Sequence, residues 1–280
     1  MTALSTARSE ASRGALLRRT GSQLGTLAGA VALWEILTRL LDRPRFPPPS
    51  AIATAIQDRW LSGPASRLFL THEATSGLSA SLGRLCLAWT CAAVAGITAG
   101  LVLGRSPRVA QYFAPVLRLC RALPPPALIP FFVVTFHAGA SMEVATIVFG
   151  TVWPVLLATM DGARSVEPLY VETATIFGVT GVRRLTQVIL PATAPKVVAG
   201  LRTGVSLSVT LMVLAELLGP GDGVGGLLVH TRRVTDLWGG VVVLGLLGYA
   251  LTALFRAAER VCLHRYGSDE GRGADRHPAP

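Results

Sequence analysis

The sequence contains little charge, few aromatic residues and almost no lysine. Of its 280 residues, 15% are charged and 6% are aromatic, whereas 51% are hydrophobic. A soluble domain of this composition would be hard to keep in solution. The single lysine, Lys196, lies in PATAPKVV without a glycine-rich turn before it. The chain therefore lacks the phosphate-binding loop GxxxxGK[ST], and we expect it to bind no ATP by that motif and to carry no cofactor of its own.

Cysteine and histidine are also scarce and show no catalytic or metal-binding arrangement. The four cysteines contain no CxxC pair and the five histidines have no metal-ligand spacing, so we expect neither a disulfide framework nor a metal site. No Ser–His–acid set can be argued, which disfavours an intramembrane enzyme. Gly221, Gly223 and Gly226 match GxGxxG, but no βαβ unit surrounds them, and we interpret them as a flexible outer turn.

Long apolar runs are what the chain has in abundance. They cover residues 24–41, 85–103, 123–136, 144–160, 197–218 and 237–255. Because a membrane-spanning helix needs about 20 apolar residues, we predict an all-α polytopic membrane protein with six transmembrane helices. Its transmembrane domain would cover residues 24–260, between an N-terminal tail at 1–23 and a C-terminal tail at 261–280. A cleaved signal peptide is the alternative for the first run, but no small-x-small cleavage site follows it.

The basic residues indicate how the chain is oriented. The net charge is +10, and the arginines cluster at the ends of apolar runs without the aromatic interleaving that stacks on bases. This favours a membrane over nucleic acid as the partner. With the N-terminus in the cytoplasm, the inner segments hold most of the 26 lysine and arginine residues, including Arg118 and Arg121. The positive-inside rule therefore predicts that both termini are cytoplasmic.

Prolines interrupt the third apolar run, LPPPALIPFFVVTF. Pro124, Pro125 and Pro130 forbid a regular helix through its first half. Broken backbone at membrane depth is tolerated only inside protein or beside a water-filled cavity, so this run is a candidate wall of a translocation path. The alternative is a loop outside the bilayer that leads into a short helix.

Polar side chains within the fifth run are further candidates for that path. Ser206 and Thr210 offer hydroxyls, and Glu216 is a carboxylate near the outer end of the run. An ionisable residue inside a membrane is by default a candidate functional residue, although an interfacial position of Glu216 is the alternative. The apolar runs contain no cluster of arginines, so the sequence indicates no fixed anion site in the membrane.

Two local spacings predict contacts within the chain. Small residues repeat every four positions in and just after the second run, at Ala88, Ala92, Gly96, Gly100 and Gly104. Such a repeat lets helices approach closely in lipid, and we interpret it as packing inside one subunit rather than as a dimer seam. Near the N-terminus, Glu35 and Arg39 share a helical face at i, i+4. Ser50 is a candidate N-cap for a short surface helix.

The connection after the fourth run, ETATIFGVTGVRRLTQVILP at residues 172–191, is polar and punctuated by glycine. Pro168, just before it, can occupy the first turn of a helix, and Gly178 suits the left-handed position after a helix end. A second short helix fits residues 182–190. Because Pro191 cannot easily continue that helix, we predict that it ends there.

The order of residues in this connection resembles the EAA loop of permease subunits in ATP-binding-cassette importers. The family pattern is Glu-Ala-Ala, three residues, Gly, nine residues and Ile-x-Leu-Pro. The matching positions are Glu172, Ala174, Gly178, Leu190 and Pro191. Thr173 replaces the middle alanine, and Val188 stands for the isoleucine. The alternative is an ordinary amphipathic cytoplasmic loop.

Further stretches are similar to the nitrate, sulfonate and taurine branch of these permeases. RALPPPALIPF at residues 121–131 is similar to that branch's RPIPPLALIPL, and DGARSVEPLYVETATIFG at 161–178 is similar to its AGVRSVDPELIEAARTLG. The resemblance covers residues 30–265. It implies a type I importer permease fold in a bacterial inner membrane, with a small anionic substrate such as a sulfonate or nitrate.

The resemblance also implies partners and a mechanism. A second copy of the permease would complete the pore, an extracytoplasmic solute-binding protein would deliver the substrate, and membrane lipids would surround the helices. Two ATPase subunits would each dock on a coupling helix at residues 168–185, so the chain would be a transport subunit and not an enzyme. Glu172 would orient the loop by hydrogen bonds. The residues implied for coupling are Glu172, Thr173, Ala174, Gly178, Arg183, Arg184, Leu190 and Pro191.

Two other transport functions are the alternatives. Similar permeases handle other organic solutes, such as vitamin precursors, and the sequence does not separate these classes because specificity resides largely in the binding protein. For a secondary transporter driven by an ion gradient, we would expect inverted repeats and paired ionisable residues at the membrane midplane. The sequence shows neither, so we favour the ATP-driven importer.

Overall fold

The computed structural model describes residues 22, 25–41, 45–219, 223–229, 231 and 233–267, and within these residues it consists of helices and connecting segments without a strand. The predicted tails at 1–23 and 261–280 lie outside them, apart from residue 22 and a helical backbone at 261–267. The chain divides into two compact units. The first comprises the described residues up to 71 together with 231–241, and the second comprises residues 72–230 and 242 onward.

In the first unit, a carboxylate of the N-terminal helix (residues 25–41) holds the start of α2 (Pro49–Trp60). Glu35 accepts hydrogen bonds from Arg39 Nε at 2.6 Å, from the Ser50 N–H at 3.0 Å and from the Ser50 hydroxyl at 2.8 Å. The predicted pairing of Glu35 with Arg39 is confirmed. The prediction of Ser50 as an N-cap is wrong, because Pro48 is the N-cap and Glu35 takes the groups with which Ser50 would have capped the helix.

The first unit also contains η1 (Ala65–Arg67) and the beginning of α11 (Val234–Gly267). The Trp238 indole donates a hydrogen bond to the Arg45 carbonyl at 3.2 Å, and its ring meets that of Trp34 edge-on. Arg59 forms an ion pair with Asp236 at 3.3 Å. Polar bonds and aromatic contacts therefore join the first turn of α11 to the N-terminal segments.

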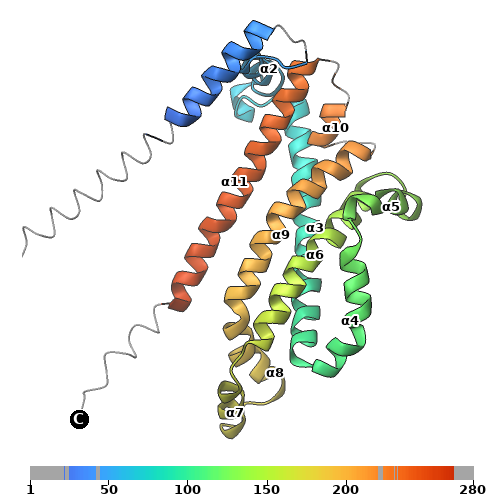
Figure 1. The fold of residues 1–280 in the computed structure, drawn as a ribbon, viewed down its shortest axis with the longest axis vertical. Coiled ribbons are helices and arrows are strands. Elements are labelled where there is room, and N and C mark those ends of the chain that lie inside the picture. Colours follow the sequence, from blue (N-terminus) through green and yellow to red (C-terminus); the bar gives the residue numbers. More distant parts are fainter. Residues whose placement is uncertain are drawn as a thin grey trace, which may run out of the picture. The chain divides into compact units, whose positions relative to one another are not determined.

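In the second unit, three long helices lie side by side: α3 (His72–Arg105), α6 (Ala140–Arg164) and α9 (Leu190–Leu218) (Figure 1). The face of α3 that carries Gly96, Gly100 and Gly104 meets α6. A Cβ atom at Gly100 would lie 2.6 Å from the Cβ of Thr159, so only glycine allows this approach. The small residues thus pack two helices of the same chain, which confirms the interpretation of the repeat.

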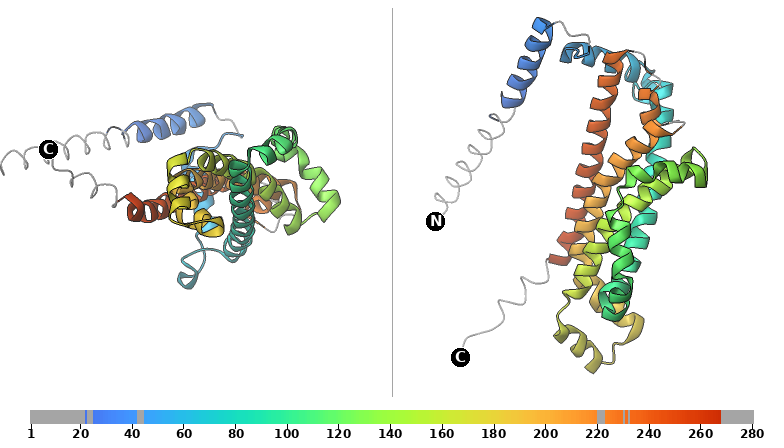
Figure 2. Two further views of the ribbon diagram at one scale, coloured as in Figure 1. Left: turned by 90° about the horizontal axis from the view of Figure 1, so that it is seen from below. Right: turned by 45° about the vertical axis from the view of Figure 1, so that its right-hand side comes forward.

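The proline-rich segment turns the chain sharply instead of forming a third straight span. α4 (Pro107–Ala122) is followed by a 3₁₀ turn, η2 (Pro125–Leu128), and the short α5 (Ile129–Phe136), and the two arms meet at 87° (Figure 2). The prolines do exclude a regular helix from the first half of the run, as expected. The run at 123–136 does not make a span by itself, because it passes the length and hydropathy requirement only together with α4, as a broken span or a re-entrant loop.

Four helical stretches are long and apolar enough to cross a membrane, and the bent pair would make a fifth. The four are Ala65–Arg105, Ala140–Arg164, Gly181–Leu218 and Val234–Arg260. The first predicted span is helical over residues 25–41, which fits a sixth crossing without establishing it. The all-helical, multi-pass architecture is therefore confirmed, while the count of six stays a prediction.

Candidate functional site

The connection between α6 and α9, residues 165–189, forms two short helices at one end of the second unit. α7 (Pro168–Ile176) and α8 (Gly181–Arg184) lie beyond the ends of the long helices (Figure 1). Pro168 starts α7, where its missing N–H leaves no gap in the hydrogen-bond ladder. The segment singled out by its EAA-like spacing is thus a compact, folded projection.

Gly178 ends α7 in the backbone conformation that the sequence predicts. Its φ is +73°, its N–H donates to the Thr175 carbonyl at 3.0 Å, and the Val179 N–H donates to the Ala174 carbonyl at 2.8 Å. These two bonds make a Schellman motif, which closes a helix through a left-handed residue. The end of α7 is consequently well defined, and only glycine adopts it without steric cost.

The chain continues as helix from α8 into α9 instead of stopping at Pro191. α8 leads through a π-helical turn, η3 (Leu185–Ile189), into α9, whose first turn contains Pro191. The expected end of the second short helix is therefore wrong. The wider π-helical turn before Pro191 accommodates the proline ring and its missing N–H, which a regular helix would not.

Contacts join α6 to α9 at the base of this projection and join its two short helices to each other. Lys196 Nζ on α9 donates to the Asp161 carbonyl at the end of α6, at 3.3 Å. A Cβ atom at Gly162 would lie 2.6 Å from Thr193, so α6 and α9 approach closely at the base of the connection. Arg184 Nη1 donates to the Thr175 hydroxyl at 3.3 Å and joins α8 to α7. Movement of α7 would therefore be transmitted to both α6 and α9.

Several apolar side chains of the projection are exposed. Exposed fractions reach 83% at Ile176, 79% at Phe177 and 75% at Val182, whereas Ala174 is buried. Glu172 is exposed, and among the described residues it makes no hydrogen bond, so the orienting bonds expected of it stay a prediction. Exposed apolar side chains on a projecting segment are typical of a protein-contact surface. Thr173, Arg183 and Leu190 are also exposed, and Arg184 and Pro191 are half-buried.

The residues expected to line a translocation path do not meet in one place. Pro125 lies against α6, where a Cβ atom at Gly150 would come within 3.2 Å of it. Ser206 and Thr210 face a cavity of 590 Å³ between α9 and α11, together with Tyr249. Pro124 is the N-cap residue of η2, and Pro130 lies in the first turn of α5. The path residues therefore stay predictions.

Glu216 is wholly buried and holds α10 (Val224–Val229) against α3 and α9. It accepts hydrogen bonds from the Ser81 hydroxyl and from the Gly225 N–H at 2.7 Å, and Ser81 accepts one from the Val224 N–H at 3.0 Å. The Glu216 carboxylate therefore binds groups of α3 and α10, and its role in a translocation path stays a prediction.

The interpretation of Gly221, Gly223 and Gly226 as a flexible turn is wrong for Gly226, which is buried inside α10, whereas Gly223 directly precedes this helix. Ser81 and Glu216 accept hydrogen bonds from the first N–H groups of α10. Gly221 lies outside the described residues.

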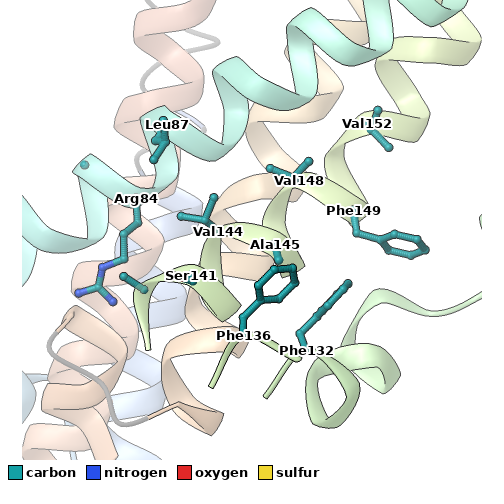
Figure 3. Close-up of a pocket in the computed structure, with 12 residues that line it drawn as sticks. Arg84, Leu87, Phe132, Phe136, Ser141, Val144, Ala145, Val148, Phe149 and Val152 are labelled. Carbon is teal, nitrogen blue, oxygen red and sulfur yellow. The ribbon is translucent and has the colours of Figure 1, made fainter. Parts of the chain in front are cut away.

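A larger cavity, of 840 Å³, lies between α3, α5 and α6 (Figure 3). Phe132 and Phe136 of α5 and Phe149 of α6 bring their rings to one side of it, and Arg84 of α3 stands at the opposite edge. Arg84 forms a buried ion pair with Glu143 at the start of α6. Sequence reasoning missed this pair, although an acidic residue directly before a long apolar run was a signal for it.

Comparison with known proteins assigns the chain to a family. The model of the family described as "Binding-protein-dependent transport system inner membrane component" matches residues 92–265. The taurine transport system permease protein TauC of Escherichia coli (strain K12) is 30% identical over 88% of this chain and 90% of its own length. The putative aliphatic sulfonates transport permease protein SsuC of Bacillus subtilis (strain 168) is 27% identical over 91% of each chain.

A solved structure with the same fold agrees with this assignment. A chain of the MetNI methionine ABC transporter, in an inward-facing crystal form, superposes with a TM-score of 0.57 at 16% sequence identity. The match covers 66% of this chain and 94% of that one. The described helices thus form an ABC-transporter permease fold, and the apolar spans fit a multi-pass membrane protein. This chain belongs to the family of binding-protein-dependent transport system inner membrane components.

Proposed function

We propose that the chain is the permease subunit of an ATP-binding-cassette importer and that residues 165–191 dock a separate ATPase. One observation carries this proposal: a short helix, closed by Gly178, presents exposed apolar side chains beyond the ends of α6 and α9. Movement of a protein bound to this surface can be transmitted to α6 and α9, the two helices at its base. Membership of the family supports the same role.

The substrate that we propose is a small anion, such as a sulfonate or nitrate. The names of TauC and SsuC assign taurine and aliphatic sulfonates to these relatives, and both carry a sulfonate group. The stretch at 121–131 supports the same branch. Another organic solute, such as a vitamin precursor, is the second candidate. A secondary transporter driven by an ion gradient is disfavoured, because the family works with a binding protein.

The assembly would contain two copies of this permease, two ATPase subunits and an extracytoplasmic solute-binding protein. The ATPase would bind and hydrolyse ATP, so the permease would remain a transport subunit without catalysis of its own. The distribution of arginines supports an orientation with residues 165–191 and both termini in the cytoplasm. Closure of the ATPases would bring the two α7 helices together and rearrange α6 and α9.

Site-specific photocrosslinking tests the proposed docking. A photoreactive phenylalanine analogue replaces Phe177 in the assembled transporter, and Val134 on α5, which is 82% exposed, is the control position. We expect a crosslink to the ATPase from position 177 and none from position 134. Absence of a crosslink from position 177, or equal crosslinking from both positions, would contradict docking at this surface.

A further inference from the structure

A cavity of 240 Å³ between α4 and the second half of α6 gathers three arginines. Arg118 and Arg121 reach it from α4, and Arg164 reaches it from the end of α6. No acidic side chain lines this cavity, and within the described residues none of the three arginines forms an ion pair. The indole of Trp153 also lines it, and its N–H is buried without a partner among the described groups. Three guanidinium groups and one indole N–H, none with an acceptor among the described groups, therefore line the same cavity.

This arrangement differs from the sequence-based prediction, which placed Arg118 and Arg121 in an inner connecting segment and found no arginine cluster in the membrane. In the structure α4 packs against α3 and α6, where Ala110 lies with Leu103 and Leu156. Trp153, which shares the cavity with Arg121, lies near the middle of α6. The arginines thus line a helix that is long and apolar enough to cross the membrane.

All three arginines are exposed, so their guanidinium groups are accessible to a ligand. Charged side chains within membrane segments are costly and generally find a partner. Arg118 and Arg121, three residues apart on one helix face, also repel each other. Arg121 gains from the helix dipole in the last turn of α4, but that effect does not bring Arg164 to the same cavity from another helix. A bound anion would compensate all three charges together.

We propose that Arg118, Arg121 and Arg164 form a binding site for the sulfonate-type oxyanion group of a transported solute. Guanidinium groups match oxyanions through paired N–H donors, and a cleft of one charge sign concentrates ions of the opposite sign. Leu157 and Met160 offer an apolar wall for a short organic tail. Since Arg164 directly precedes residues 165–191, the bound anion would lie beside the coupling segment. This inference rests on the proposed transport of small anions.

Binding of ³⁵S-labelled ethanesulfonate to the full-length permease in phosphatidylcholine nanodiscs tests the site. We expect saturable binding that weakens about tenfold or more in Arg121→Gln and in Arg118→Gln, because each loses a charge-assisted contact. Arg121→Lys keeps the charge and should lose less. Arg108→Gln, on the same helix but outside the cavity, is the matched control and should bind within about twofold of the unmodified protein. Absence of binding, or equal binding by all variants, would overturn the proposal.

A phospholipid headgroup carries the same oxyanion chemistry, so a second arm separates the two sources. Ethanesulfonate binding is repeated in nanodiscs with phosphatidylglycerol, and retained lipid is measured by native mass spectrometry. Binding that persists in both lipids supports a solute site. Retention of phosphatidylglycerol that excludes ethanesulfonate and is lost in Arg121→Gln would assign the site to lipid and overturn the proposal.

The site and the docking role can fail separately. Arg121→Gln should still crosslink to the ATPase from position 177, because the variant leaves α7 untouched. If the unmodified chain binds ethanesulfonate through these arginines but never crosslinks to an ATPase, the docking proposal fails and the anion site stands. If crosslinking succeeds and no arginine variant changes anion binding, the anion site fails and the docking proposal stands.

Discussion

Two buried carboxylates of this permease, Glu143 and Glu216, are each stabilised by a partner on another helix. The Arg84–Glu143 pair is almost fully buried, with side-chain exposures of 13% and 2%. Glu216 has no exposed surface and is held by Ser81 and a backbone N–H. Removing one member of a buried ion pair leaves the other charge uncompensated, which costs more than replacing both by apolar residues.

Replacement of Glu143 alone should therefore destabilise the protein more than replacement of the whole pair. We expect Glu143→Leu to cost about 3–5 kcal/mol in unfolding free energy, and the double variant Arg84→Met/Glu143→Leu to recover most of that loss. Thermal unfolding in detergent, followed for both single variants and the double variant, measures the coupling. A double variant whose loss equals the sum of the single losses would show that the two side chains do not stabilise each other.

At the scale of elements, the sequence predicted best what depends on near neighbours. The four-residue repeat in α3 indicated close packing, and the Schellman motif at Gly178 rests on bonds between residues 174 and 179. The prediction failed at Pro191, where an irregular turn changes what proline can do. It also failed at α4, because Arg118 and Arg121 lower the hydropathy of this helix, and the sequence did not indicate that its side chains pack against α3 and α6.

The packing of α3 on α6 can be tested with two glycines of the same helix. A Cβ atom at Gly100 would lie 2.6 Å from the Thr159 Cβ and 2.7 Å from the Leu156 carbonyl, whereas nothing lies within 4 Å of one at Gly83. We expect Gly100→Ala to destabilise the protein by about 1–3 kcal/mol, because the helices must separate. Gly83→Ala should be neutral or stabilising by up to about 1 kcal/mol.

Thermal unfolding of the two alanine variants in the same detergent provides the measurement. Equal unfolding temperatures for Gly100→Ala and Gly83→Ala would mean that α3 and α6 are less closely packed than the structure indicates.

For the whole molecule, long-range placement is what the sequence could not supply. Ser81 meets Glu216, and Arg164 shares a cavity with Arg118 and Arg121, only because helices distant in sequence pack together. A single sequence carries no signal for such pairings. The candidate coupling segment could be predicted from the sequence, because its motif is contiguous and its conformation is determined locally. The lining of the pore could not be predicted in the same way, since its candidate residues lie on separate helices.

Gly178 links the local conformation to the proposed function of the whole assembly. Valine there is strained by about 1–2 kcal/mol because of the positive φ, although its Cβ would meet nothing within 4 Å. The permease should therefore fold and insert into the membrane while the end of α7 is distorted. Gly139, at the opposite end of α6, also has a positive φ, of +155°, and open space around it. Gly139→Val is thus a matched control for backbone strain.

ATP hydrolysis stimulated by the substrate-loaded binding protein, in proteoliposomes that contain the assembled transporter, tests the central claim most directly. The account predicts that Gly178→Val loses this stimulation and binds the ATPase more weakly, whereas Gly139→Val retains both. Full stimulation in Gly178→Val, or equal failure of the two variants, would contradict a coupling role for residues 165–191.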